Sequence, residues 1–259
     1  MSEQRASAGP KTADDPRYRL LGSAHRGNAF EETVEHLLRG IKLGVFTPAE
    51  RLPAERELAE LLGVSRATLR EALAELQKAG YIRIQRGRYG GAFVCDGLPS
   101  GGAALEAADV ARVEDVLTFR AVVEPAAAAL AAAAPLAAAQ RTALLASLRA
   151  VATADPSQYR PLDARLHVAI AELTDSPSLV SAVAEARAAT SDLLDRIPFL
   201  AMNISHSDAQ HEAIVRAILG GEPERARVLM SEHLDGTAAL LRGFLADAAG
   251  PAGRERMPG

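Results

Sequence analysis

The chain has 259 residues, of which 48% are hydrophobic, 24% charged and only 4% aromatic, and its net charge is −4. This is the composition of a globular protein with one large domain or two ordinary ones. Cys95 is the only cysteine, so no disulfide can form within the chain, which fits a reducing cytoplasm. We expect no membrane-spanning segment and no signal peptide, so the sequence predicts a soluble cytoplasmic protein.

The charge is unevenly distributed along the chain. Residues 1–29 (5 basic, 3 acidic) and 30–95 (10 basic, 9 acidic) carry +2 and +1, whereas residues 96–259 (14 basic, 21 acidic) carry −7. An acidic body repels a polyanion, whereas the N-terminal part can approach one. The asymmetry hints at nucleic acid as a partner, although many two-domain enzymes show as much.

The predicted elements divide the chain into a small head and an all-helical bundle. A disordered arm (1–28) precedes predicted helices at about 30–41, 55–62 and 66–79 and a hairpin with strands at 81–85 and 92–94. A Gly/Pro/Ser-rich linker at 96–104 then leads to predicted helices at 109–133, 137–153, 159–173, 177–196, 207–219 and 223–247, and to a tail at 248–259. The predicted fold class is mainly α, with a winged helix-turn-helix head at 29–95 joined to an all-α bundle at 105–247.

The run "LPAERELAELLGVSRATLREALAELQKAGYI" has the layout of a helix-turn-helix. Gly63 takes the turn, and Ser65 is a good N-cap for the second helix of the motif. The first exposed turns of that helix then present Arg66, Thr68 and Arg70. Arginine and threonine at this position can read base edges in the major groove or hold phosphate.

Basic groups elsewhere in the head support the same reading. Arg56 on the preceding helix is placed to touch the DNA backbone, and the hairpin adds Arg86 with no acidic residue between 81 and 95. Gly87 lets the hairpin come close to a sugar-phosphate edge. The alternative is a short helical hairpin with solvated arginines, but the turn, the inward leucines, the outward arginines and the basic hairpin coincide. The sequence therefore predicts DNA binding.

Four polar side chains of the bundle fall on predicted inward faces: Asp163, His167, His211 and His233. Asp163 and His167 are four residues apart on one helix and share a face. Burying so many polar groups is unfavourable unless each has a partner, and one divalent cation partners all four. Imidazole and carboxylate suit zinc, with nickel, manganese or iron as alternatives. On a six-coordinate ion, four protein ligands leave two positions for water or a small molecule.

The head resembles a known family. Residues 30 to 94, with "RLPAERELAELLGVSRATLREALAELQKAGYIRIQRGRYGGAFV", are similar to the winged helix-turn-helix of the GntR family of bacterial transcription regulators. The resemblance implies a homodimer that reads a palindromic operator in double-stranded DNA. It also implies that Arg56, Arg66 and Arg70 contact the DNA, with Ser65, Thr68, Arg86 and Gly87 in supporting roles.

The bundle, from about 109 to 240, resembles the FCD effector domain of the FadR subfamily of GntR regulators. The similar segments are "FRAVVEPAAAALAA", "DARLHVAIAELTDSPSL", "QHEAIVRAILGGEPERA" and "MSEHL". The resemblance implies a ligand sensor in which Asp163, His167, His211 and His233 hold the metal ion and Arg120 pairs with a carboxylate effector. One departure is "TDSPSL", where the family more often has Gly-Asn, and it concerns the local turn rather than the ligands.

The leading interpretation is a metabolite-responsive transcription regulator, most often a repressor in this family. We expect a homodimer from the resemblance and from the long apolar helices at 109–133 and 223–247. The alternative from another class is a metal-dependent hydrolase with an accessory head, although the bundle offers no clear motif for a general acid or base. A third reading makes the polar cluster a metal-free hydrogen-bond network in a dimerisation domain.

Overall fold

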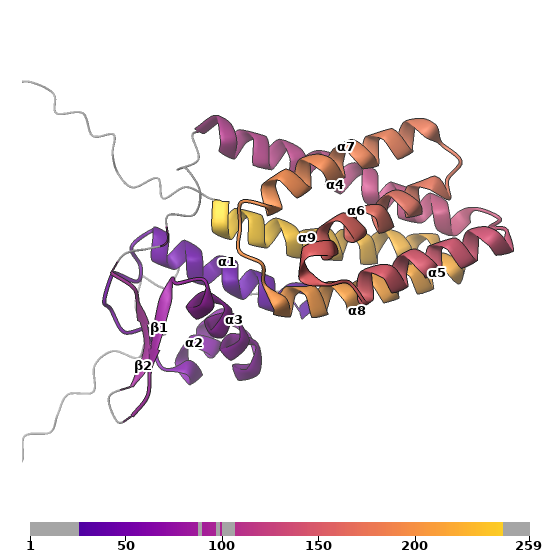
Figure 1. Cartoon of the computed structure of the whole chain (residues 1–259). Helices are drawn as coiled ribbons and strands as arrows, with labels where there is room; N and C mark the ends of the chain where they lie inside the picture. Colours follow the sequence, from indigo (N-terminus) through magenta and orange to yellow (C-terminus); the bar gives the residue numbers. More distant parts are fainter. Residues whose placement is uncertain (1–25, 88–89, 97–98, 100–106, 246–259) are drawn as a thin grey trace, which may run out of the picture. The chain divides into compact units, whose positions relative to one another are not determined.

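The computed structural model describes residues 26–87, 90–96, 99 and 107–245. The chain divides into two compact units between Pro99 and Ser100, inside the stretch that we expected to be a linker. Residues 1–25 of the predicted arm, the predicted tail and most of the linker lie outside the described residues. Figure 1 shows the two units, the head in indigo to magenta and the bundle in magenta to yellow.

The described part of the head contains a short 3-10 helix (Arg26–Asn28), three α-helices and a hairpin: α1 (Ala29–Lys42), α2 (Glu55–Leu62), α3 (Arg66–Lys78), β1 (Ile82–Gln85) and β2 (Gly91–Val94). These bounds agree with the predicted elements to within one residue. The strands pair antiparallel with Ile82 opposite Val94, and a bridge joins Phe93 to Arg51. Both α1 and α2 pack on α3, and Leu69 of α3 is fully buried.

The turn between α2 and α3 depends on two small residues. Gly63 ends α2 with φ of 68°, in the left-handed region that glycine adopts without strain. Two residues later, Ser65 caps α3, because its Oγ accepts a hydrogen bond of 3.0 Å from the backbone N–H of Thr68. The first turn of α3 is therefore sharply defined, as the sequence predicts.

Between residues 107 and 245, six helices form the bundle: α4 (Ala107–Ala133), α5 (Ala138–Ala152), α6 (Pro156–Glu172), α7 (Pro177–Leu194), α8 (Ala201–Leu219) and α9 (Pro223–Leu245). The longest, α4, packs mainly against α9 and also against α6, α7 and α8, whereas α5 covers α6 and α8 (Figure 1). Ala128 and Ala131 of α4 are fully buried, and such small side chains let neighbouring helices approach closely.

Two helices begin earlier than the sequence predicts. Helix α6 begins at Pro156 rather than at 159, because a proline in the first turn has no internal N–H bond to lose. Helix α8 begins at Ala201 rather than at 207, and its added turns pack Ile204 against the core. The added turns of α8 also place Asn203 and Ile204 in the wall of the cavity described below.

Part of α4 corrects the expectation that no segment is apolar enough to cross a membrane. Within the described residues, Ala111–Ala133 meets that criterion by length and composition, with a mean hydropathy of 1.5. Half of the most apolar stretch is buried, and Arg120 and Glu124 form an ion pair in its interior-facing middle. Its packing against four other helices makes α4 the core helix of the bundle.

Candidate functional site

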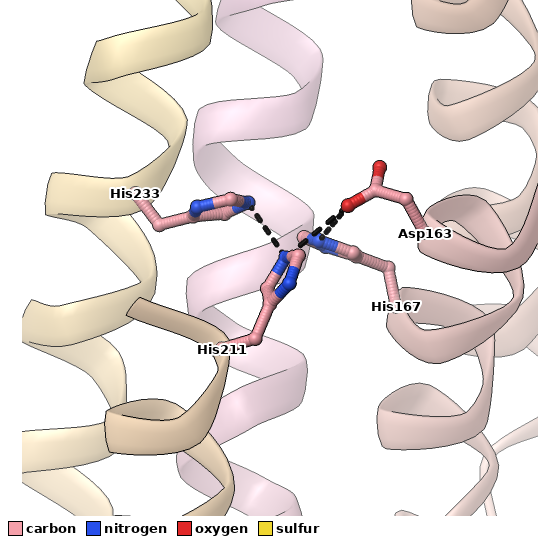
Figure 2. A group of neighbouring side chains, drawn as sticks. All are labelled: Asp163, His167, His211 and His233. Atoms are coloured by element: carbon pink, nitrogen blue, oxygen red, sulfur yellow. Dashed lines mark hydrogen bonds and ion pairs between the residues drawn. The ribbon is translucent and has the colours of Figure 1, made fainter. Parts of the chain in front are cut away.

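Four side chains from three helices converge inside the bundle. Asp163 and His167 lie on α6, His211 on α8 and His233 on α9, and each residue is at most 8% exposed. One possible ligand atom from each lies within 4.8 Å of the others. Figure 2 shows the three imidazoles and the carboxylate pointing toward a common centre. The structure thus brings together all four residues that the sequence predicts as metal ligands.

The distances between these atoms fit a shared ion. Nε2 of His211 lies 3.2 Å from Nε2 of His233 and 3.2 Å from Oδ1 of Asp163. Nε2 of His167 lies 3.8 Å from the same Oδ1. With bonds of about 2.1 Å, two ligands of one ion are about 3.0 Å apart at a right angle and about 4.2 Å apart when opposite. The widest separation between two of the four ligand atoms, at most 4.8 Å, therefore needs to shorten only slightly for all four to bind one ion.

Hydrogen bonds behind two of the rings direct their Nε2 lone pairs inward. Nδ1 of His167 donates to Oε2 of Glu124, and Nδ1 of His233 donates to Oε1 of Gln210 at 3.0 Å. Because both acceptors are oxygens, the proton of each neutral ring is on Nδ1 and Nε2 is free to bind a metal. Within the described part of the chain, Nε2 of His167 has no hydrogen-bond partner. Such a carboxylate behind a histidine is usual at metal sites.

The protonation states also suit a cation. Burial, reinforced by the charge of Arg187, lowers the pKa of His167 to about 4, and burial holds the pKa of His233 well below its usual value. Burial opposes ionisation of Asp163, but Arg187 and a hydrogen bond from His211 outweigh it and hold the pKa of Asp163 well below its usual value. At neutral pH His167 and His233 are therefore neutral imidazoles and Asp163 is a carboxylate, which are the forms that bind a metal.

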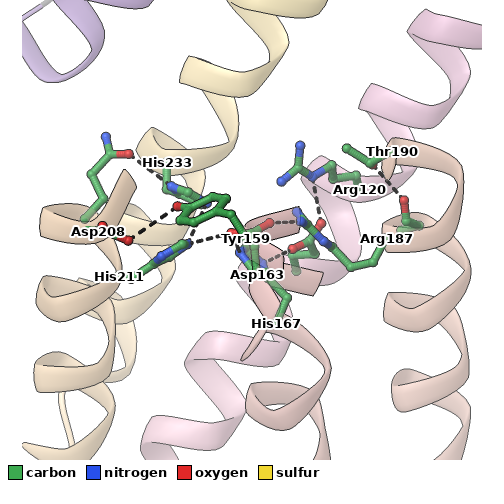
Figure 3. A network of polar contacts seen from close by, with 12 residues as sticks. Arg120, Tyr159, Asp163, His167, Arg187, Thr190, Asp208, His211 and His233 are labelled. Atoms are coloured by element: carbon green, nitrogen blue, oxygen red, sulfur yellow. Dashed lines mark hydrogen bonds and ion pairs between the residues drawn. The ribbon is translucent and has the colours of Figure 1, made fainter. Parts of the chain in front are cut away.

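Three further buried and charged side chains of the described residues lie beside the cluster, and Figure 3 labels two of them, Arg120 and Arg187. Arg187 on α7 donates to Oδ2 of Asp163. Nε of Arg120 on α4 donates to Oε1 of Glu124 at 2.8 Å, and Glu124 in turn accepts from His167. All three residues are at most 3% exposed. The sequence analysis did not predict a role for Arg187 or Glu124. Only Glu124 could have been found from the sequence, because it lies four residues after Arg120, the spacing of an ion pair on a helix.

A small cavity lies against the cluster. Its volume is about 50 Å³, and Asp163, Arg187 and His233 contribute to its wall. At about 10–15 Å³ for each water, it has room for a few waters or a short organic acid. Arg120, which the resemblance implies as the partner of a carboxylate effector, lies beside Glu124, and Arg187 is the buried arginine in the cavity wall. Nη1 and Nη2 of Arg120 have no hydrogen-bond partner among residues 26–87, 90–96, 99 and 107–245.

The arginines predicted to contact DNA lie on the exposed surface of the head. Nη1 of Arg56 pairs with Glu60 at 3.1 Å. On α3, Nε of Arg70 lies 2.6 Å from Oε2 of Glu55, and Nη2 of Arg66 lies 3.9 Å from the same oxygen. Glu55, which sequence reasoning did not single out, thus holds the two arginines of α3 side by side.

The supporting residues of the predicted DNA interface lie at the start of α3 and on the hairpin. The hydroxyls of Ser65 and Thr68 are 2.8 Å apart, which fixes both at the first turn. Arg86 and Gly87 are exposed just after β1. Gly87 has φ of 108°, which an L side chain rarely adopts, so this turn requires glycine.

A winged helix-turn-helix followed by a helical domain with a buried ligand cluster defines a DNA-binding transcription regulator. Residues 30–94 match the model of bacterial regulatory proteins of the gntR family, and residues 115–236 match the model of the FCD domain. The chain belongs to the GntR family of bacterial regulatory proteins and carries an FCD effector domain.

Two relatives that align with most of this chain are named as regulators. The chain is 34% identical over 226 residues to the HTH-type transcriptional regulator RmpR of Mycobacterium gastri, covering 84% of this chain and 80% of the relative. It is 30% identical over 221 residues to an Escherichia coli (strain K12) protein named for regulation of the L-lactate dehydrogenase operon, covering 81% and 84%. The solved structure of Streptococcus agalactiae GntR is 24% identical, covers 81% of this chain and 98% of that one, and has a TM-score of 0.42. The family and the named relatives indicate a transcription regulator rather than the hydrolase considered as the alternative.

Replacing Glu124 tests whether it orients His167 for a metal. We expect Glu124→Gln to weaken zinc binding by about 10- to 100-fold, the usual effect of losing such a partner. The measurement is a competition titration of metal-stripped protein against a chromophoric zinc chelator. Glu172→Gln, at an exposed glutamate of α6, is the control and should bind zinc like the unaltered protein. Equal zinc affinity in both variants contradicts the assignment.

Proposed function

We propose that this regulator is a metabolite-responsive repressor that acts as a cytoplasmic homodimer on a palindromic operator. In this proposal the bundle holds a divalent ion, zinc first, and a small carboxylate effector that changes operator affinity. The observation that carries it is the buried cluster of one aspartate and three histidines beside a cavity, in a chain of the GntR family. When bound, the ion supplies positive charge and open positions for an anionic ligand.

Charge balance favours an anionic effector. The buried charges of Arg120 and Arg187 are matched by those of Glu124 and Asp163, so these four side chains sum to zero. A divalent ion adds two positive charges to this interior, where uncompensated charge is strongly unfavourable. A carboxylate at the cavity offsets part of that charge and can accept hydrogen bonds from arginine.

The effector is proposed to act by bridging helices. Residues of α6, α7, α8 and α9 line the cavity, so a bound acid contacts four helices at once. Unequal contacts in two arrangements of the bundle shift their populations, and operator affinity changes with them. Arg120 of α4 is not in the cavity wall, but two of its nitrogens lack partners in the described residues, and it is proposed to contact the end of the acid that reaches the metal ligands. The E. coli relative named for the L-lactate dehydrogenase operon makes L-lactate one acid to test.

The homodimer is proposed to form through the outer face of α4. Phe119, Val122 and Leu130 of α4 are 37%, 66% and 53% exposed and recur at helical spacing, with Ala126 between them. Most of the C-terminal half of α9, the other helix from which we expected a dimer contact, is buried within the subunit. An exposed apolar stripe on a long helix is typical of an interaction surface.

The DNA-binding proposal predicts a loss of affinity when either exposed arginine of α3 is removed. Arg66→Ala or Arg70→Ala should weaken operator binding by about 1–3 kcal/mol, the range for a bidentate base contact. The operator is first selected from random double-stranded DNA, and affinity is then measured by fluorescence anisotropy at fixed salt. Arg149→Ala, at an exposed arginine of α5, is the control. Unchanged affinity in both α3 variants would falsify their assignment.

The metal proposal predicts that ion binding and effector response are lost together. Alanine at His167, His211 or His233 should lower zinc content and abolish the response to short carboxylates, while effector-free DNA binding persists. Arg120→Ala should keep the metal and lose the response. Zinc is measured by mass spectrometry on protein purified without a His-tag, with His206→Ala as the control on α8. The proposal is wrong if the wild-type protein contains no divalent ion and binds none on titration.

The dimer proposal predicts that a charge on the α4 stripe separates the subunits. Val122→Glu should give a monomer at micromolar concentration in sedimentation velocity, because a carboxylate is poorly tolerated in an apolar interface. Leu145→Glu, at a partly exposed position of α5, is the matched control and should remain dimeric. A wild-type monomer, with and without DNA, or a dimeric Val122→Glu variant contradicts this interface.

A further inference from the structure

A cationic side chain lies where the buried cavity adjoins an open groove. The groove has a volume of about 660 Å³ and is lined by the start of α6, the end of α7 and the segment between α7 and α8. Arg160, Ile197 and Phe199 line both the groove and the cavity. A ligand that reaches the cavity from the groove therefore passes Arg160.

The partner of Arg160 is exchangeable. Nη1 of Arg160 lies 2.6 Å from Oδ1 of Asp195, and Nη2 lies 3.4 Å from the backbone oxygen of Ile197. The side chain of Asp195 is 70% exposed, whereas that of Arg160 is 24% exposed. An ion pair with one solvated partner is weak, so a second carboxylate held in place by other contacts can displace Asp195.

Two cationic groups and several apolar side chains line the cavity. Arg187, buried beside Asp163, lines the cavity but not the groove and so marks the inner end, whereas Arg160 lines both. Arg160 and Asp163 are three residues apart on α6, which places them on one helix face, about 5–6 Å apart at Cβ. The wall also contains Leu200, Ile204 and Leu240, which suit a short hydrocarbon chain.

We infer that Arg160 is a second anchor for the effector and that the effector is a short linear dicarboxylate. One carboxylate lies at the inner end, near Arg187 and the metal ligands, and the other replaces Asp195 on Arg160. The inference rests on the proposed function of the bundle as a carboxylate sensor and names its ligand class. Two negative charges also match the two that a divalent ion brings into the neutral cluster of arginines and carboxylates.

Pairs of acids that differ only by a methyl or a carboxylate test this inference. Full-length zinc-loaded protein is titrated calorimetrically with propionate against malonate and with butyrate against succinate. In at least one pair, the diacid should bind about tenfold more tightly or better, the effect of one charge-assisted hydrogen bond. Metal analysis of the protein after each titration verifies that the diacid has not removed the zinc.

Two substitutions assign the difference to Arg160. Arg160→Gln should weaken binding of the diacid to that of its monoacid and leave the monoacid unchanged. Asp195→Asn, which frees Arg160, should tighten binding of the diacid several-fold and leave the monoacid unchanged. Arg165→Gln, at a neighbouring exposed arginine of α6, is the control and should keep the full difference. Because the result is a ratio of two affinities, a general loss of stability does not imitate it.

The outcomes separate this inference from the function on which it rests. If monoacids bind as tightly as diacids, or if both substitutions change the two classes equally, Arg160 merely holds the connection between α7 and α8 and the inference is wrong. In that case the carboxylate sensor stands. If no acid of either class binds zinc-loaded protein, the proposed function fails and the inference fails with it.

Discussion

The carboxylate of Asp163 joins four helices of the bundle, and much of the interior depends on its charge. From α6, its Oδ2 accepts from Arg187 on α7, while its Oδ1 faces His211 on α8 and, beyond it, His233 on α9. A carboxylate that is 8% exposed is very unfavourable without a compensating cation. Arg187 supplies that cation, so removing Asp163 also leaves the buried guanidinium of Arg187 without its ion-pair partner. Substitution of Asp163 therefore cannot separate its proposed metal role from its role in folding, and the histidines are the better positions at which to test metal binding.

A second chain of contacts ties the central helix to the same centre. Arg120 and Glu124 of α4 reach His167 of α6 through two successive hydrogen bonds. The surrounding packing is rich in alanine and poor in aromatic side chains, and alanine faces resemble one another along a helix. A buried network with fixed partners can select one helix register where apolar shape alone discriminates weakly. We infer that the charged network sets how α4 and α6 align, in addition to any metal that it orients.

The sequence was informative where structure is local. Gly63 and Ser65 lie within one turn of each other, so the start of α3 follows from backbone and capping preferences. Asp163 and His167 share a face because helical periodicity alone places them there. The roles of Glu124 and Arg187 were not predicted, because their hydrogen-bond partners are 43 and 24 residues away in the sequence. Helical periodicity does not relate positions on different helices. The early start of α8 was not predicted for a related reason, since its added turns pack Ile204 against the core. The early start of α6 was local and follows from Pro156 in its first turn.

The two faces of α4 connect the proposed site with the proposed dimer. Arg120 and Glu124 lie on its inner face, and Phe119 and Val122, within five residues of both, lie on its outer face. A ligand that alters the contact between Glu124 and His167 acts on the same helical turns that carry the apolar stripe. Because a helix moves as a rigid element, a shift or rotation on the inner side is transmitted to the outer side without a chain of intermediate residues. On the two proposals above, α4 takes part both in ligand sensing and in subunit contact.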